Sequence, residues 1–159
     1  MKILMVCLGN ICRSPLAEGI MQNKINKNNL DWEVDSAGTG AWHVDELPDP
    51  RSIKVAQKNN IDITNQRARQ FRPTDLDSFD LILTMDSSNF QNVKRHVTSP
   101  KQLNKIHMIM NFVNPGMNQV VPDPYYGSHG FETVFEMLDN ACNKIIEQYH
   151  VNGKVNMSI

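Results

Sequence analysis

Short apolar runs along the chain predict four β-strands. Apolar runs of this length, bounded by Gly, Pro, Asn or Asp, are typical of strands buried on both faces of a parallel sheet. The fourth of these predictions is weaker than the others. The predicted strands lie at 1–6, 32–37, 79–84 and 105–110.

Segments with helical periodicity separate these strands. The first predicted helix begins at Ser14-Pro15, with Ser14 as the N-cap and Pro15 at the first helical position, and it ends near 28–29. A second helix is predicted over 50–59, and Asp86 caps a third. The last helix has the clearest period, with apolar residues at Phe131, Val134, Phe135, Leu138, Ala141, Cys142, Ile145, Ile146 and Tyr149.

Alternation of strands and helices predicts an α/β fold: a three-layer sandwich with a four-stranded parallel sheet flanked by helices. The length of 159 residues fits one domain. We place that domain at 1–151 and expect 152–159, which has no pattern, to be a frayed tail. In such folds ligands bind beyond the carboxyl ends of the strands, so loops after strands are the first candidates for a site.

Composition excludes several classes of protein. Sixteen basic and 17 acidic residues give a net charge of −1, which provides no broad basic surface for nucleic acid. No apolar run approaches the roughly 20 residues that cross a membrane, and the start of the chain does not resemble a signal peptide. Three cysteines cannot form the disulfide framework of a small secreted domain. We therefore expect a cytoplasmic protein that binds neither nucleic acid nor membrane.

The loop after the first strand carries the most specific pattern, Cys-x5-Arg-Ser at 7–14. A loop between a strand and a helix start turns N–H groups inward at the positive end of the helix dipole, which makes a cradle for an anion. Those groups would stabilise the thiolate of Cys7. Arg13 offers a planar fork for two oxygens of a tetrahedral oxyanion, and Ser14 can donate its hydroxyl to the sulfur. This set suits transfer of a phosphoryl group to sulfur.

Three simpler interpretations compete with that one. Cys7 could be a buried core cysteine at a strand end. Cys7 and Cys12 could be half a zinc site, but Cys142 lies on a helix core face and the five histidines show no ligand spacing. A nucleotide-binding P-loop would need G-x4-G-K-[ST], which is absent from the sequence.

The sequence resembles the low-molecular-weight protein tyrosine phosphatases. Val-Cys-Leu-Gly-Asn-Ile-Cys-Arg-Ser-Pro at 6–15 resembles the active-site signature of that family, and Asp-Pro-Tyr-Tyr-Gly at 123–127 resembles its second signature. Shorter matches extend the resemblance over nearly the whole chain: SAG at 36–38, PDPRS at 48–52, RARQ at 67–70 and Met85-Asp86.

The resemblance implies a role for each matching residue. Cys7 would be the nucleophile, Arg13 would bind the phosphoryl oxygens, and Asp123 would be the general acid and base. Ser14 would support the thiolate, while Asn10, bonded to Ser36, would hold the loop in an unusual conformation. The residues of the implied phosphate-binding loop are Leu8, Gly9, Asn10, Ile11, Cys12 and Ser14. The implied walls of the substrate cleft are Trp42 on one side and Tyr125 and Tyr126 on the other.

Elementary chemistry supports the role of Asp123 independently. A leaving phenolate needs a proton, and the second step needs a base for water. Pro124 biases Asp123 away from helical geometry and toward a loop that can reach across a pocket, although Asp-Pro is also an ordinary turn. An aromatic cleft fits a phenyl phosphate, but Trp42 could also be an ordinary exposed loop residue.

Several positions refine the resemblance. Related phosphoarginine phosphatases carry a polar residue at the position of Ile11, so Ile11 favours phosphotyrosine. The family pattern implies a reversible disulfide between Cys7 and Cys12 that protects the nucleophile, although Cys12 could merely pack. Gln66 stands where the family often has histidine. Arg67, Arg69 and Arg72 form a basic patch that is a solvated surface by default.

We therefore expect a cysteine-dependent phosphatase that hydrolyses phosphotyrosine and small aryl phosphates through a cysteinyl-phosphate intermediate. Its partners would be a phosphotyrosine protein and product phosphate, with no metal or cofactor, and it would be a monomer or weak homo-oligomer. Two alternatives remain: a thiol-dependent arsenate reductase of the same fold and a non-catalytic phospho-ligand-binding module. The reductase needs further cysteines near the end of the third strand, and 84–88 contains none.

Overall fold

The computed structural model describes residues 1–126, 130–151 and 154–155, and it contains the predicted parallel sheet. The strand order is β2-β1-β3-β4, and every neighbouring pair in this sheet is parallel. The strands are β1 (Lys2–Cys7), β2 (Glu33–Gly38), β3 (Leu81–Thr84) and β4 (Ile106–Met108). The prediction of four parallel strands is therefore confirmed.

Helices connect the strands, and two of the short ones escaped prediction. The α-helices are α1 (Arg13–Lys27), α2 (Pro50–Lys58), α3 (Asp75–Ser78), α4 (Ser87–Lys94), α5 (Pro100–Leu103) and α6 (Gly130–Tyr149). Two 3-10 helices, η1 (Ile109–Phe112) and η2 (Pro124–Tyr126), follow β4. The sequence did not predict α3 and α5, because four residues are too few to show a helical period.

Two short strands follow α6. β5 (His150–Val151) pairs antiparallel with β6 (Lys154–Val155). Apart from β6, the predicted frayed tail at 152–159 lies outside the described residues.

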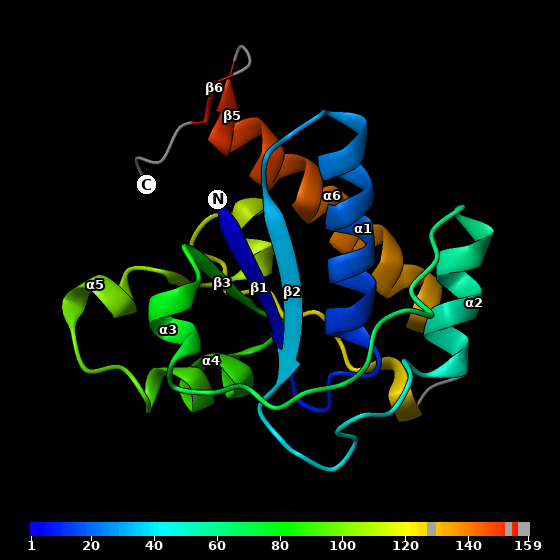
Figure 1. Cartoon of the computed structure of the whole chain (residues 1–159), viewed down its shortest axis with the longest axis horizontal. Helices are drawn as coiled ribbons and strands as arrows, with labels where there is room; N and C mark the ends of the chain where they lie inside the picture. Colours follow the sequence, from blue (N-terminus) through cyan, green and yellow to red (C-terminus); the bar gives the residue numbers. More distant parts are fainter. Residues whose placement is uncertain (127–129, 152–153, 156–159) are drawn as a thin grey trace.

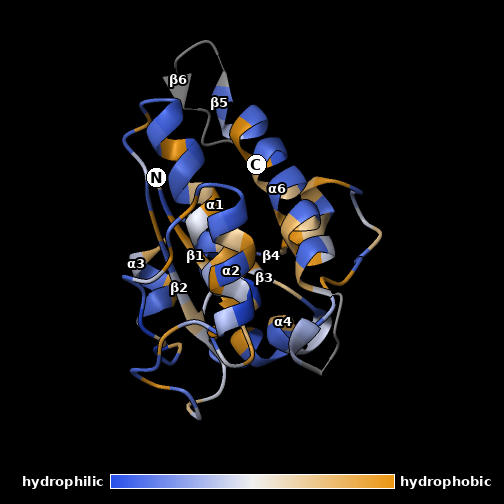
Figure 2. Ribbon diagram, turned by 90° about the vertical axis from the view of Figure 1, so that its right-hand side faces the viewer, coloured by the Kyte–Doolittle hydropathy of each residue, from blue (hydrophilic) through white to orange (hydrophobic). Residues whose placement is uncertain are grey.

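Helices cover both faces of the sheet and complete the three-layer sandwich (Figure 1). Helices α1, α2 and α6 share one buried apolar cluster with Ile3 and Met5 of β1. Leu4 and Val6 of the same strand belong to a second cluster, with residues of α3 and α4. Successive side chains of a strand point to opposite faces, which is why β1 supplies both clusters. Figure 2 shows apolar and polar residues alternating around α1 and α6.

Cys142 belongs to the first cluster and is fully buried, which confirms its prediction as a core residue. Burial raises the pKa of the Cys142 thiol to about 12, so this cysteine remains an apolar packing group. No helix in the described part of the chain is long and apolar enough to cross a membrane.

The strand order places the functional loops at one edge of the sheet. The chain runs from β1 through α1 to β2 on one side, and β3 lies on the other side of β1. Loops that leave neighbouring strands in opposite directions open a crevice at their carboxyl ends. Cys7 ends β1 beside Gly38, which ends β2, and Asp86 follows β3 closely.

Candidate active site

Cys7 lies at the base of the crevice, where β1 passes into the loop at 8–12. Its side chain is buried, and its sulfur lies 3.0 Å from the hydroxyl oxygen of Ser14. The backbone N–H of Asn10 donates a hydrogen bond of 3.3 Å to the same sulfur. The N–H of Asn10 and the N-terminal end of α1 place positive partial charge near the sulfur.

Ser14 lies inside α1, because this helix begins one residue before the predicted N-cap. The N-cap is Cys12, the first helical residue is Arg13, and no side chain caps this end of the helix. The prediction of Ser14 as N-cap is therefore wrong. Its hydroxyl is fully buried and contacts the sulfur of Cys7 instead, so the N-terminal N–H groups of α1 are not covered by a capping side chain.

Asn10 fixes the shape of the loop. It adopts the left-handed backbone conformation, with φ of 57°, which Asn tolerates better than most residues. Its side-chain amide donates to the hydroxyl oxygens of Ser14 at 2.7 Å and Ser36 at 2.9 Å. Its amide oxygen accepts a hydrogen bond of 3.0 Å from the backbone N–H of Arg69. The loop is thus tied to α1, β2 and the segment before α3 at once.

The segment after β2 holds the other side of the loop. Thr39 N–H donates to the carbonyl of Cys7, and Gly40 N–H donates to the carbonyl of Leu8. Gly38 permits this approach, because a Cβ atom there would lie 2.8 Å from the carbonyl oxygen of Leu8. A glycine at the end of β2 is therefore required for the loop to lie this close to the sheet.

Arg13 is held so that one side of its guanidinium remains available. Nη1 donates to a carboxylate oxygen of Asp86 at 2.8 Å and to the carbonyl of Val121 at 2.9 Å. Nη2 lies 3.8 Å from a carboxylate oxygen of Asp123. The Arg13 side chain is only 4% exposed, so its orientation is set by these partners rather than by water. This fixed fork can bind the oxygens of a phosphoryl group.

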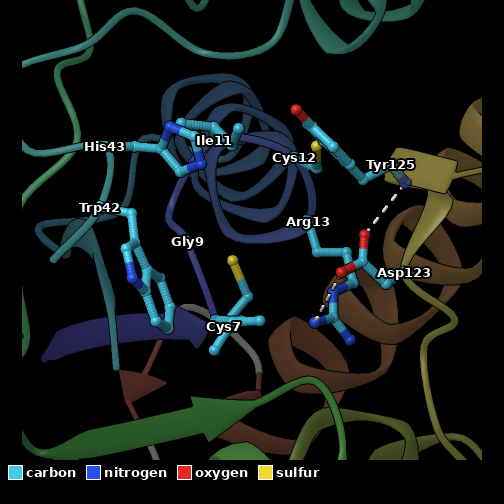
Figure 3. Close-up of a pocket in the computed structure, with 10 residues that line it drawn as sticks. Cys7, Gly9, Ile11, Cys12, Arg13, Trp42, His43, Asp123 and Tyr125 are labelled. Atoms are coloured by element: carbon cyan, nitrogen blue, oxygen red, sulfur yellow. Dashed lines mark hydrogen bonds and ion pairs between the residues drawn. The ribbon is translucent and has the colours of Figure 1, made fainter. Parts of the chain in front are cut away.

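Asp123 faces Arg13 from the loop before η2 (Figure 3). Its second carboxylate oxygen accepts a hydrogen bond of 3.0 Å from the backbone N–H of Tyr125. The Asp123 side chain is 35% exposed, which leaves it open to both substrate and water. One cavity is lined by both Cys7 and Asp123, although they lie 116 positions apart in the sequence.

This cavity has a volume of about 320 Å³ and contains most of the predicted site residues. Trp42 and His43 stand on one side and Tyr125 on the other, with the sulfur of Cys7 between them (Figure 3). Its lining residues are Cys7, Leu8, Gly9, Ile11, Cys12, Arg13, Trp42, His43, Asp123 and Tyr125. The predicted residues Asn10, Ser14 and Ser36 lie behind this lining as hydrogen-bond partners. Tyr126 belongs to η2, but its side chain lies outside the described residues.

Two residues of the site were missed by the sequence. His43 lines the cavity next to Gly9 and pairs with Glu46, and nothing in the spacing of the long loop at 38–50 indicates this position. Asp86 was predicted only as a helix cap. It does accept a hydrogen bond from Asn89 N–H at the start of α4, and its other oxygen accepts from Arg13.

Cys12 lines the cavity as a buried free thiol. Burial is the largest cause that raises its pKa, and the neighbouring charges of Asp49, Cys7 and Asp123 act in the same direction, to about 12. The raised pKa keeps the Cys12 thiol protonated at physiological pH. Among the described residues no group of three or more His, Cys, Asp or Glu side chains could hold a metal ion.

A half-buried carboxyl, that of Glu18, extends the hydrogen-bond network behind the loop. The hydroxyl of Ser36 donates to Glu18 at 2.7 Å while its oxygen accepts from Asn10. Burial raises the pKa of Glu18 to about 7, although the hydrogen bond from Ser36 opposes the increase. Gln66, at the position where histidine is common in the family, donates to the carbonyl of Pro15.

Comparison with known proteins shows which family the chain resembles over nearly its whole length. A model of the family "Low molecular weight phosphotyrosine protein phosphatase" matches residues 2–155. A protein of that name from Schizosaccharomyces pombe is 44% identical over 147 residues, covering 89% of this chain and 93% of the relative.

Solved structures are similar over the same length. A protein tyrosine phosphatase from Entamoeba histolytica superposes with a TM-score of 0.86 at 35% identity, covering 93% of this chain and 96% of that one. An arginine phosphatase from Drosophila superposes with a TM-score of 0.88 at 31% identity, covering 96% and 99%. The family match spans both signatures and the whole sheet, so the chain belongs to the low-molecular-weight phosphotyrosine protein phosphatase family.

Proposed function

We propose that this enzyme hydrolyses phosphotyrosine in proteins, and small aryl phosphates, through a phosphoryl group carried on Cys7. The observation that supports it most is the meeting of Cys7, Arg13 and Asp123 in one cavity with an aromatic residue on each side. A nucleophile, an anion clamp and a group able to transfer protons are the parts that the reaction requires.

In the first step the Cys7 thiolate attacks phosphorus in line with the tyrosyl oxygen. The S–P bond forms as the P–O bond to tyrosine breaks, and Asp123 in its acid form donates a proton to the departing oxygen. Arg13 Nη2 and the loop N–H groups bind the phosphoryl oxygens, whose charge is spread over them in the transition state. Ser14 donates its hydroxyl to the sulfur.

In the second step the Asp123 carboxylate takes a proton from water, and the oxygen of that water attacks phosphorus. The S–P bond breaks, inorganic phosphate leaves, and the thiolate of Cys7 is restored with the hydroxyl of Ser14 3.0 Å away. The residues of this chain supply every proton transfer in both steps.

The cavity walls support an aromatic leaving group. Trp42 and Tyr125 lie on opposite sides of the sulfur, and Ile11 adds an apolar side chain to the lining. Flat apolar walls would stack against a phenyl ring and hold phosphorus at a fixed depth. Because one structural relative is a Drosophila arginine phosphatase, phosphoarginine is the main alternative substrate. The apolar side chain of Ile11 favours phosphotyrosine over it.

The redox role of Cys12 belongs to the same proposal. Peroxide would oxidise the Cys7 thiolate to a sulfenic acid, and the Cys12 thiol would then displace the hydroxyl as water to form a disulfide. A dithiol reductant would restore both thiols. This protection suits an enzyme of the cytoplasm, where thiols are kept reduced.

A substrate panel tests the proposal directly. The wild-type enzyme should hydrolyse para-nitrophenyl phosphate and a phosphotyrosine peptide, with much lower activity on phosphoserine and phosphoarginine peptides and no thiol-dependent reduction of arsenate. Cys7→Ser should lose turnover. Rapid acid quenching of Asp123→Ala should reveal a phosphoryl group on the peptide that contains Cys7. Preferred cleavage of phosphoarginine, reduction of arsenate, or turnover by Cys7→Ser would each overturn the proposal.

A further inference from the structure

A second hollow adjoins the active-site cavity along the carboxyl edge of the sheet. It has a volume of about 590 Å³ and shares Leu8 and Trp42 with the active-site cavity. It lies between the segment after β2, residues 70–73 and the C-terminal end of α4. Figure 1 shows that the segment after β2 and α4 both lie at the lower end of the sheet. We refer to this hollow as the basic groove.

The charge of the groove has one sign. Arg72 and Arg95 line it, and none of its lining residues carries a carboxylate. The sequence as a whole has one more acidic than basic residue, so this is a local concentration of positive charge. A groove lined by one sign of charge attracts the opposite sign and favours it over neutral groups.

Arg72 and Arg95 differ from the other arginines near the site. Arg13, Arg51 and Arg69 each pair with a carboxylate of their own chain. Both groove arginines are exposed, and across 1–126, 130–151 and 154–155 neither guanidinium has a hydrogen bond or ion pair. They are therefore available for carboxylates of another molecule.

Apolar surface lies beside these cations. Phe71 lines the groove, and its ring lies 5.8 Å from the ring of His96, measured between centroids. Trp42, which is 73% exposed, stands between the groove and the cavity that contains Cys7. A polypeptide that enters the cavity with one side chain can therefore continue across Trp42 into the groove.

We propose that the basic groove binds an acidic segment of the substrate polypeptide, a few residues from its phosphotyrosine. This inference rests on the proposed hydrolysis of phosphotyrosine and adds a preference for sequence context. An extended segment advances about 3.3 Å per residue, so side chains of two or three neighbouring residues span a groove of this size. Asp or Glu at those positions forms ion pairs with Arg72 and Arg95.

The test compares peptides that differ only in charge. Three phosphotyrosine peptides carry acidic residues before the phosphotyrosine, acidic residues after it, or Gln and Asn in their place. The groove variant is Arg72→Gln/Arg95→Gln. The control Lys94→Gln/Lys101→Gln removes the same charge from exposed residues that do not line the groove.

The wild-type enzyme should prefer one acidic peptide over the neutral one, and kcat/KM for it should fall on the order of five-fold in the groove variant. The preference should also shrink as salt is added. Activity on the neutral peptide and on para-nitrophenyl phosphate should stay unchanged, as should every activity of the control variant. Equal preference for all peptides, or an equal loss in the control variant, would overturn the proposal.

Binding of non-hydrolysable phosphonate forms of the same peptides separates this inference from the proposed function. Absence of turnover on every substrate would overturn the proposed function. The difference in binding affinity between acidic and neutral phosphonate peptides does not depend on turnover, so it tests the groove alone. If the groove variant instead loses self-association in sedimentation while peptide preference persists, the groove binds a second copy of the chain and the proposal is wrong.

Discussion

Arg13 donates a hydrogen bond of 2.8 Å from Nη1 to a carboxylate oxygen of Asp86, joining the first residue of α1 to the N-cap of α4. The two residues follow β1 and β3, which are neighbours in the sheet. Because this bond uses Nη1, the Nη2 group is directed toward Asp123 and the cavity. The orientation of Arg13, the proposed anion clamp, is therefore held in part by a residue outside both signature segments.

Substitution of Asp86 tests that dependence. Asp86→Asn removes the charge but keeps an oxygen that can cap α4, whereas Asp86→Ala removes both. We expect kcat/KM for para-nitrophenyl phosphate to fall about 10-fold in both variants, because Arg13 loses a charge-assisted hydrogen bond. Tm should fall by several degrees only in Asp86→Ala. An Asp86→Asn enzyme with normal activity would show that Arg13 does not need this partner.

Replacement of Asp123 should reveal its proton-transfer role through the leaving group. Asp123→Ala should lower kcat/KM ~100-fold for phenyl phosphate, whose leaving group needs a proton, and much less for para-nitrophenyl phosphate. The measurement is a series of aryl phosphates whose phenols differ in pKa. An equal loss across the series would show that Asp123 only positions the substrate, for example through its contact with Arg13.

Glu18 should make the stability of the enzyme depend on pH. Burial raises the pKa of this carboxyl from 4.5 to about 7, so between these values the folded state binds a proton that the unfolded state releases. The free energy of unfolding therefore falls as pH rises through this window. Glu18→Gln keeps an acceptor for Ser36 and removes the titration.

Thermal unfolding from pH 5 to 8 measures this effect. Glu18→Gln should exceed the wild type in Tm by roughly 3–6 °C at pH 8, and the difference should shrink toward pH 5. The exposed Glu136→Gln is the matched control and should show no such pH-dependent difference. A difference in Tm for Glu18→Gln that stays constant across the range would contradict the titration of Glu18.

Cys12 should determine whether oxidation of Cys7 can be reversed. After brief exposure to peroxide, the wild type should regain most of its activity with a dithiol reductant, because a disulfide with Cys12 can be reduced. Cys12→Ser should regain little, because Cys7 proceeds to sulfinic acid. Cys142→Ala, altered in the core, should behave as the wild type. Intact masses distinguish the two oxidation states, and full recovery of Cys12→Ser would contradict the redox role.

The sequence predicted the sheet and the main helices because their apolar periods are long enough to be specific. It misplaced the start of α1, since a Ser-Pro pair is normally a helix start, and the contacts of Ser14 with Cys7 and Asn10 prevail over capping. It missed α3 and α5 because each has only four residues.

The cavity could be anticipated only in part. Cys7 and Arg13 were predictable because their spacing in one loop is itself chemically meaningful. His43 and the Arg13 partner role of Asp86 were not, since both depend on how the loops after β2 and β3 approach the first loop in three dimensions. Likewise, the sequence does not show that Arg69 is paired with carboxylates while the guanidinium of Arg72 is not, because this depends on which carboxylates lie near each in the fold.

Gly38, at the end of β2, and Gly40, two residues later, provide a matched pair. One tests the backbone of the site and the other its aromatic wall. A Cβ atom on Gly38 would lie 2.8 Å from the carbonyl oxygen of Leu8 and 3.1 Å from the backbone nitrogen of Asn10, and backbone atoms cannot move without distorting the loop. A Cβ atom on Gly40 would instead meet the ring of Trp42, which is exposed and can rotate away.

Gly38→Ala should therefore lower both Tm and kcat for para-nitrophenyl phosphate, because the loop that carries Cys7 has to shift. Gly40→Ala should leave Tm within about 2 °C of the wild type, since an exposed side chain gives way. Its KM for aryl phosphates should rise as Trp42 leaves the cleft, and Trp42→Ala should reproduce this effect. Equal effects of Gly38→Ala and Gly40→Ala on Tm and kcat would show that the two contacts are not independent.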